Sequence, residues 1–122
     1  MSEEFLRVAK KEVSDDITEI GNILLSCHTD SDILKNAAQI EKHTHKLKGL
    51  APMMGKNEIG NVAATLDALL KMVISERPIP DLFQSIKKSH QFMLDAITDH
   101  ETDYASLKNE LDKKYSVFFS QK

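Results

Sequence analysis

The chain of 122 residues has no tryptophan and a single cysteine, Cys27. A lone thiol cannot form an intrachain disulfide, which agrees with a reducing compartment. Cys27 and His28 do not make a nucleophile and base pair, because adjacent side chains diverge and no carboxylate is placed to orient the imidazole. We therefore expect Cys27 to be an exposed or half-buried thiol at a helix end.

Long apolar runs and an excess of positive charge are also missing. The N-terminus is acidic, so neither a signal peptide nor a membrane span is predicted, and we expect a cytoplasmic protein with no membrane partner. The net charge is -3, and basic tails and zinc-finger spacings are absent, so nucleic acid is not an expected partner. Without a glycine-rich phosphate loop, the chain does not supply its own ATP chemistry.

Apolar residues recur with helical periodicity, whereas period-two alternation and hairpin turns are absent. The first stripe predicts a helix from an N-cap at Ser2 to about Ser26 and consists of Phe5, Ala9, Val13, Ile17, Ile20 and Leu24. The second stripe consists of Ile33, Ala37, Ile40, Thr44, Leu47, Ala51 and Met54. The third consists of Ile59, Val62, Leu66, Leu69 and Val73, and the fourth of Leu82, Ile86, Met93 and Ile97. A weaker fifth stripe consists of Tyr104, Leu107, Leu111 and Phe118.

Turn-forming residues separate these stripes. Gly55 can take the left-handed conformation that closes the second helix, and Asn57 is the predicted N-cap of the third. The prolines that follow predict a stop near Glu76 and place Pro80 in the first turn of the fourth helix.

The pattern predicts an all-α protein. Four amphipathic helices joined by short turns bury their stripes most simply as an antiparallel up-down four-helix bundle, here over about residues 3–99. The fifth segment predicts an additional C-terminal helix, over about residues 101–119, docked on the outside. The length suits one core, so residues 1–122 are predicted to form a single domain.

The most informative string is His45-Lys46-Leu47-Lys48-Gly49 on the second helix. At about 100° per residue, His45 lies roughly 120° from the centre of the buried stripe and faces solvent or a bundle edge. Neutral imidazole is a good nucleophile near pH 7, and Lys48, one turn further along, can offset the charge of a phosphoryl group on it. Gly49 costs about 1 kcal/mol relative to alanine within a helix, so a packing or functional reason for it is expected, and its place beside a reactive side chain favours function.

The other histidines carry no predicted chemistry. His43 and His45 point about 200° apart on a helix and cannot share a metal ion, so no metal site is expected. His90 and His100 have no neighbours at ligand spacing, and we interpret both as solvated or capping residues.

The string His45-Lys46-Leu47-Lys48-Gly49 resembles the H-x-hydrophobic-K-G signature of histidine phosphotransfer domains. The residues after it, Leu50-Ala51-Pro52-Met53-Met54-Gly55, are similar to the variant in the N-terminal phosphotransfer domain of the chemotaxis histidine kinase. The resemblance covers roughly residues 3 to 99. It implies that His45 is phosphorylated, that Lys48 is the cation beside the phosphate and that Gly49 provides clearance for the partner.

Two positions depart from that kinase domain. Where it usually has a glutamate on the third helix that holds the other ring nitrogen of the histidine, this chain has the shorter Asp67. Asp67 either orients the imidazole or is a solvated residue on the flank of the helix. Pro52 cannot donate to the carbonyl of Lys48 and is predicted to bend the second helix just beyond the site.

Receiver domains of response regulators are the partners that the resemblance implies, together with a histidine kinase. A second, outward stripe of the same helix is the predicted docking face, and it consists of Ala38, Lys42, His45, Gly49, Pro52 and Lys56, with Met53 beside it. No cofactor is expected on this chain, and the Mg²⁺ of the reaction is expected on the receiver.

Two other functions stay open. The dimerisation helix of a sensor kinase also carries a phosphorylated histidine, but its string continues with Thr or Asn and then Pro, where this chain has Gly49. A plain interaction bundle in which His45 has no chemistry is the second alternative. Whether the chain stands alone or is the first domain of a larger kinase is left undecided by the sequence.

Overall fold

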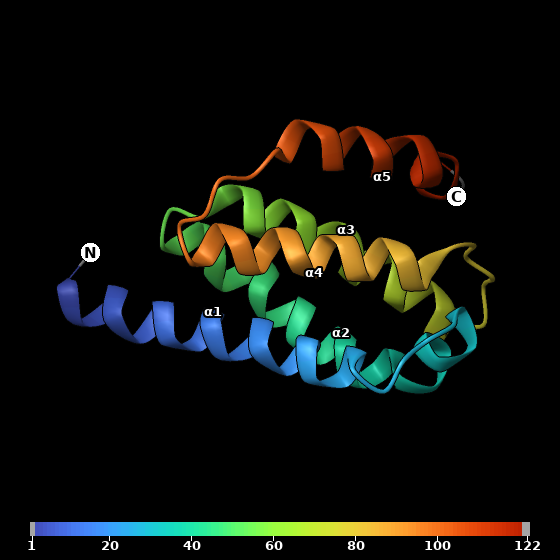
Figure 1. The fold of residues 1–122 in the computed structure, drawn as a ribbon, viewed down its shortest axis with the longest axis horizontal. Coiled ribbons are helices and arrows are strands. Elements are labelled where there is room, and N and C mark those ends of the chain that lie inside the picture. Colours follow the sequence, from blue (N-terminus) through green and yellow to red (C-terminus); the bar gives the residue numbers. More distant parts are fainter. Residues whose placement is uncertain (1, 121–122) are drawn as a thin grey trace.

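A computed structural model describes residues 2–120 and shows five helices and no strand in that range. The helices are α1 (Glu3–Leu24), α2 (Asp30–Met53), α3 (Asn57–Ile74), α4 (Leu82–Ile97) and α5 (Tyr104–Phe119) (Figure 1). The all-α prediction is therefore confirmed, including the additional C-terminal helix. Over the same residues, no helix has the length and apolar character needed to cross a bilayer.

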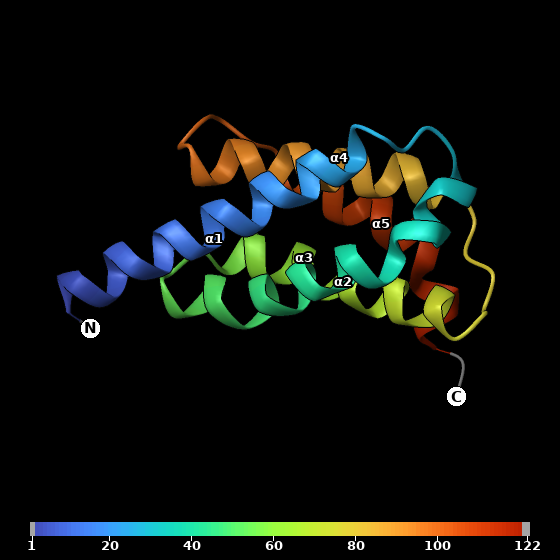
Figure 2. The same ribbon diagram turned by 90° about the horizontal axis from the view of Figure 1, so that it is seen from below.

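The first four helices pack around one core. Helix α2 contacts α1, α3 and α4, and α4 closes the group through contacts with α1 and α3. Helix α5 contacts α4 and lies outside the other four (Figures 1 and 2). The up-down order predicted for the bundle remains a prediction. The apolar stripes of α2, α3 and α4 face this core, and the only predicted member of those stripes that is not fully buried is Met54.

Local chemistry explains where the first two helices begin and where α2 ends. The Ser2 hydroxyl accepts the backbone N–H of Phe5 at 3.0 Å, which confirms the predicted cap of α1. Thr29 and Asp32 form a reciprocal capping box at the start of α2, and such a box satisfies backbone N–H groups left free at a helix end. Gly55 follows α2 with a φ of 84°, the left-handed conformation predicted for it.

Two predicted helix starts are wrong. Asn57 is not the N-cap but the first residue of α3. The N-cap of α3 is Lys56, whose side chain makes no capping hydrogen bond. Pro80 does not enter α4, which begins at Leu82 after Asp81 in a left-handed conformation. The physical reason at Pro80 is tertiary, because its carbonyl accepts the hydroxyl of Tyr115 from α5 at 2.9 Å.

Tyr115 also explains how α5 is attached, although the weak fifth stripe did not include it. Its ring is fully buried, and its hydroxyl lies 2.8 Å from the Ser85 hydroxyl of α4. Lys114 adds an ion pair with Asp81 at the start of α4. A tyrosine is an adequate core residue when its hydroxyl finds a partner, and here the partners come from the chain segment around the start of α4.

The prediction for Cys27 is wrong as well. The residue is 2% exposed and belongs to the core. Its thiol donates to the carbonyl of Ile23 at 3.4 Å, and burial raises the pKa of the thiol. Cys27 lies in the turn between α1 and α2 with its side chain in the core, so it is a small packing residue rather than a reactive one.

Candidate functional site

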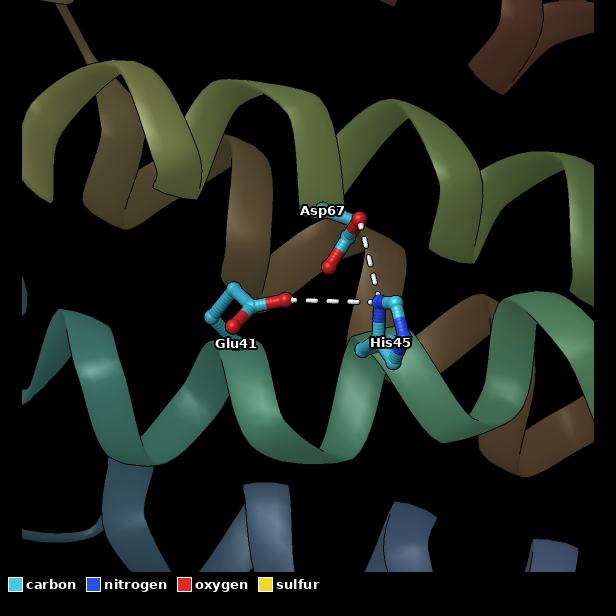
Figure 3. Close-up of side chains that lie close together, drawn as sticks. All are labelled: Glu41, His45 and Asp67. Atoms are coloured by element: carbon cyan, nitrogen blue, oxygen red, sulfur yellow. Dashed lines mark ion pairs between the residues drawn. The ribbon is translucent and has the colours of Figure 1, made fainter.

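His45 lies on the outer side of α2, and its side chain is 59% exposed. The buried stripe of α2 packs on the other helices and turns this position outward, as predicted. The Nδ1 atom of the ring faces two carboxylates, at 3.8 Å from Glu41 Oε2 and 3.8 Å from Asp67 Oδ2. Figure 3 shows the other ring nitrogen, Nε2, pointing away from both. The nitrogen that is free for chemistry is therefore the outward one.

Asp67 is brought to this site by α3, and its side chain is 2% exposed. Its Oδ2 lies 3.1 Å from the Lys48 ammonium and 3.0 Å from that of Lys71, and its Oδ1 accepts the Thr44 hydroxyl at 3.3 Å. The alternative that Asp67 is a solvated flank residue is wrong. At 3.8 Å, however, its contact with His45 is longer than a hydrogen bond.

The partners of Asp67 also set its charge state. Burial by itself would raise the pKa of this carboxyl, but the neighbouring Glu41 side chain, the ammonium groups of Lys71 and Lys48 and the Lys48 charge lower it to about 2. Asp67 is therefore ionised at neutral pH and holds two ammonium groups beside the imidazole.

Glu41 is the site residue that the sequence analysis missed. Its side chain is 20% exposed, while its Oε2 is closed off from solvent and has no hydrogen-bond partner. The adjacent Asp67 carboxyl, followed by burial, raises the pKa of Glu41. Its position four residues before His45 on the same helix was the available signal, because residues at that spacing lie side by side.

Lys48 and Gly49 occupy the places predicted for them one turn beyond His45. The Lys48 side chain is 40% exposed, and its ammonium is held by Asp67. A methyl group added at Gly49 would meet no heavy atom within 4 Å. The surface beyond His45 is thus open, as the clearance role of Gly49 requires.

The predicted docking stripe on α2 is largely exposed, since Ala38, Lys42 and Met53 face solvent. The prediction that Lys56 belongs to the same helix is wrong, because α2 ends at Met53 and Lys56 follows the turn at Gly55 as the N-cap of α3. Lys56 is partly covered there and pairs with Asp99 at 3.4 Å. Leu34, which the sequence analysis did not include, is 55% exposed on the same helix and extends this apolar surface.

Pro52 is exposed and also contributes to the packing of α2 against α3. Helix α2 continues through Pro52 to Met53, and the proline ring lies over Gly60 of α3. A Cβ at Gly60 would come within 2.5 Å of the Pro52 ring, so these two residues allow α2 and α3 to approach closely. The bend predicted at Pro52 remains a prediction.

His43 is turned toward α1 and does not share the surroundings of His45. Its Nδ1 lies 2.8 Å from Asp16, a buried residue of α1 whose carboxylate also pairs with Lys46 at 3.1 Å. The two histidines thus contact carboxylates on different helices. This agrees with the prediction that they cannot ligate one ion.

The interpretation of His90 as solvated or capping is wrong. Its Nε2–H donates to the carbonyl of Ile17 in α1 at 2.9 Å, and burial lowers the pKa of the ring. Gly21 leaves the space for this ring, because a Cβ there would lie 2.8 Å from His90 Nε2. His100 is exposed beside Thr98, as expected.

Glu41, His45 and Asp67 offer three ligand atoms within 4.8 Å of one another, the spacing of a metal site. Two ammonium groups already contact Asp67 Oδ2 and would compete with a divalent cation there. The same groups suit a different task, since they place positive charge beside an exposed nucleophilic nitrogen. The geometry favours transfer of an anionic group to and from His45 Nε2.

Comparison with known protein families gives one clear result. A family model described as Hpt domain matches residues 4–113, a span that runs from α1 into α5 and contains every residue of the site. Neither the curated proteins nor the solved structures gave a match.

Proposed function

This chain belongs to the Hpt domain family, and on that premise we propose that His45 carries a phosphoryl group which it exchanges with the aspartate of a receiver domain. The family has a phosphotransfer role in two-component signalling. The observation that supports His45 as the carrier is its exposed ring, with Nδ1 facing Glu41 and Asp67 and Nε2 pointing away from both.

The transfer step needs only groups that the two partners bring. The Nε2 lone pair attacks phosphorus of the aspartyl phosphate on the receiver, an N–P bond forms, and the P–O bond breaks with its electron pair returning to the aspartate. The Nδ1 proton stays on the ring. Lys48 offsets part of the phosphoryl charge, and the reverse transfer runs through the same positions.

A receiver domain and a histidine kinase are the proposed partners, and the docking stripe defined by Ala38, Lys42, His45, Gly49, Pro52, Lys56 and Met53 is the proposed receiver surface. Lysines on this stripe suit an acidic receiver pocket. We place the Mg²⁺ of the reaction on the receiver, with no cofactor on this chain.

The proposed function is tested by labelling. Incubation with a phosphorylated receiver domain should transfer phosphate to the protein, and the product should be acid-labile and alkali-stable, as expected for phosphohistidine. Peptide mapping should place it on residue 45. A chain that remains unlabelled by receivers and kinases would instead support the plain interaction bundle.

The docking surface is tested by amide chemical shifts. Adding an unphosphorylated receiver should perturb backbone amides of α2 along the docking stripe, because those positions would be covered by the partner. Amides of α5, which lies outside the bundle, serve as the internal control. Perturbations confined to α5 would refute the proposed surface.

Gly49 should show opposite effects on stability and activity. Gly49→Ala should raise the free energy of unfolding by up to about 1 kcal/mol, because the added methyl meets open space and alanine favours the helix. Gly49→Gln should keep the fold but slow phosphotransfer about tenfold or more, because a long side chain beside His45 keeps the receiver from close approach.

Thermal melts and transfer rates on the two Gly49 variants check this prediction. If both variants melt well below the parent, Gly49 is needed for packing, and the clearance role must be withdrawn.

A further inference from the structure

We propose that Glu41 is the residue that positions His45, by accepting the Nδ1–H of the imidazole and leaving Nε2 free to attack. This inference rests on the proposed function and adds to it a positioning residue on the same helix. Glu41 does not touch the phosphoryl group, so its effect passes through the imidazole.

The first argument is the unpaired oxygen of Glu41. Its Oε2 is closed off from solvent, has no hydrogen-bond partner and points at His45 Nδ1 from 3.8 Å (Figure 3). A buried carboxylate oxygen without a donor is costly, and small rotations of two side chains bring this pair to hydrogen-bond distance. His45 Nδ1 is the cation-forming nitrogen that the structure pairs with Oε2, so we assign the Nδ1–H group as its donor.

The second argument is that the Asp67 carboxylate already pairs with two lysines. Its Oδ2 is as far from Nδ1 as Glu41 Oε2 is, but it is shared by two ammonium groups at 3.0 and 3.1 Å. Moving Asp67 toward His45 would weaken those contacts, whereas moving Glu41 breaks no hydrogen bond to Oε2. Asp67 then serves as the anchor for Lys48 and Lys71.

The consequence for the reaction follows from charge. When Nε2 bonds to phosphorus, positive charge develops on the ring, and a carboxylate at Nδ1 stabilises it. The proton remains on Nδ1 in both transfer directions, and Glu41 neither gains nor loses a covalent bond. The same contact holds the Nδ1–H tautomer in the unphosphorylated protein.

Glu41→Gln and Glu41→Ala test the assignment, with Glu19→Gln on the exposed face of α1 as a matched control for the loss of one charge. Both Glu41 variants should slow transfer from a phosphorylated receiver by about 10- to 100-fold, the usual effect of losing a group that orients a histidine. The control should transfer at the parental rate. Glu41→Gln should melt no lower than the parent, because the adjacent Asp67 and burial disfavour the charged form of Glu41.

The tautomer of the His45 ring distinguishes a positioning role of Glu41 from a merely structural one, because loss of a structural residue would leave the tautomer unchanged. The ¹⁵N shifts of its ring nitrogens should report Nδ1–H in the parent and a mixture of the two tautomers in Glu41→Ala. Parental shifts and rates in both Glu41 variants, together with a loss of both in Asp67→Asn, would overturn the inference and assign positioning to Asp67. A parent protein that accepts no phosphate would refute the proposed function instead, whatever the ring shifts show.

Discussion

Replacing His45 with glutamine is expected to abolish phosphate labelling completely. Glutamine is similar in size and uncharged, but its amide has no nucleophilic lone pair to replace that of Nε2. The exposed position of residue 45 means that the substitution removes little packing, so the variant should melt close to the parent. The measurement is transfer of labelled phosphate from a receiver domain, with a thermal melt on the same sample.

His43→Gln is the matched control, since this histidine lies two residues away on the same helix. It should retain labelling, because its ring faces Asp16 of α1 and lies away from the docking stripe. Some loss of stability is expected here, because Asp16 is buried and loses a hydrogen-bond partner. Labelling of His45→Gln together with loss of labelling in His43→Gln would show that the carrier has been assigned to the wrong residue.

Replacing Asp67 with asparagine is expected to lower the free energy of unfolding by up to about 2 kcal/mol at pH 7. The pKa of Asp67 falls from 3.8 to about 2 in the folded protein, and a shift of that size corresponds to about this free energy. Because the folded pKa is the lower one, the contribution is present above about pH 4 and is lost as pH falls to about 2. The difference between parent and variant should therefore shrink on acidification.

Glu41 contributes with the opposite sign. Its pKa is raised in the folded protein, first by Asp67 and then by burial, so its charged form costs stability above its ordinary pKa of 4.5. Removing the Asp67 charge relieves part of this cost. Measuring Asp67→Asn both in the parent and in the Glu41→Gln background separates the two effects, because the pair is in direct contact.

Urea unfolding at pH 7, 4 and 2.5 checks the prediction for Asp67. Asp112→Asn is the control, since this exposed carboxylate pairs with Lys108 one turn away and should change stability by only about 0.5 kcal/mol or less. An equal loss for Asp67→Asn at pH 7 and pH 2.5 would mean that the two lysines do not stabilise the Asp67 charge.

The helices and the outward position of His45 could be predicted from the sequence because both depend on local spacing. Apolar residues at helical period identified the buried side of α2, and that side determined by subtraction that His45 and Gly49 point outward. The cap at Ser2 and the left-handed Gly55 are likewise properties of a few neighbouring residues. Such features need no knowledge of which helices become neighbours.

Only the tertiary structure decided the surroundings of those residues. Asp67 was left between two roles by the sequence and became a buried anchor for Lys48 and Lys71 because α3 packs along α2. Cys27 joins the packed core, and His90, Tyr115 and Pro80 form hydrogen bonds with residues that are distant in sequence. Glu41 was within reach of a local argument, but its unpaired oxygen exists only because folding closes it off from water. Burial and hydrogen bonding between distant residues depend on how the helices pack together. The apolar periodicity along one helix does not determine which residues of other helices become its neighbours.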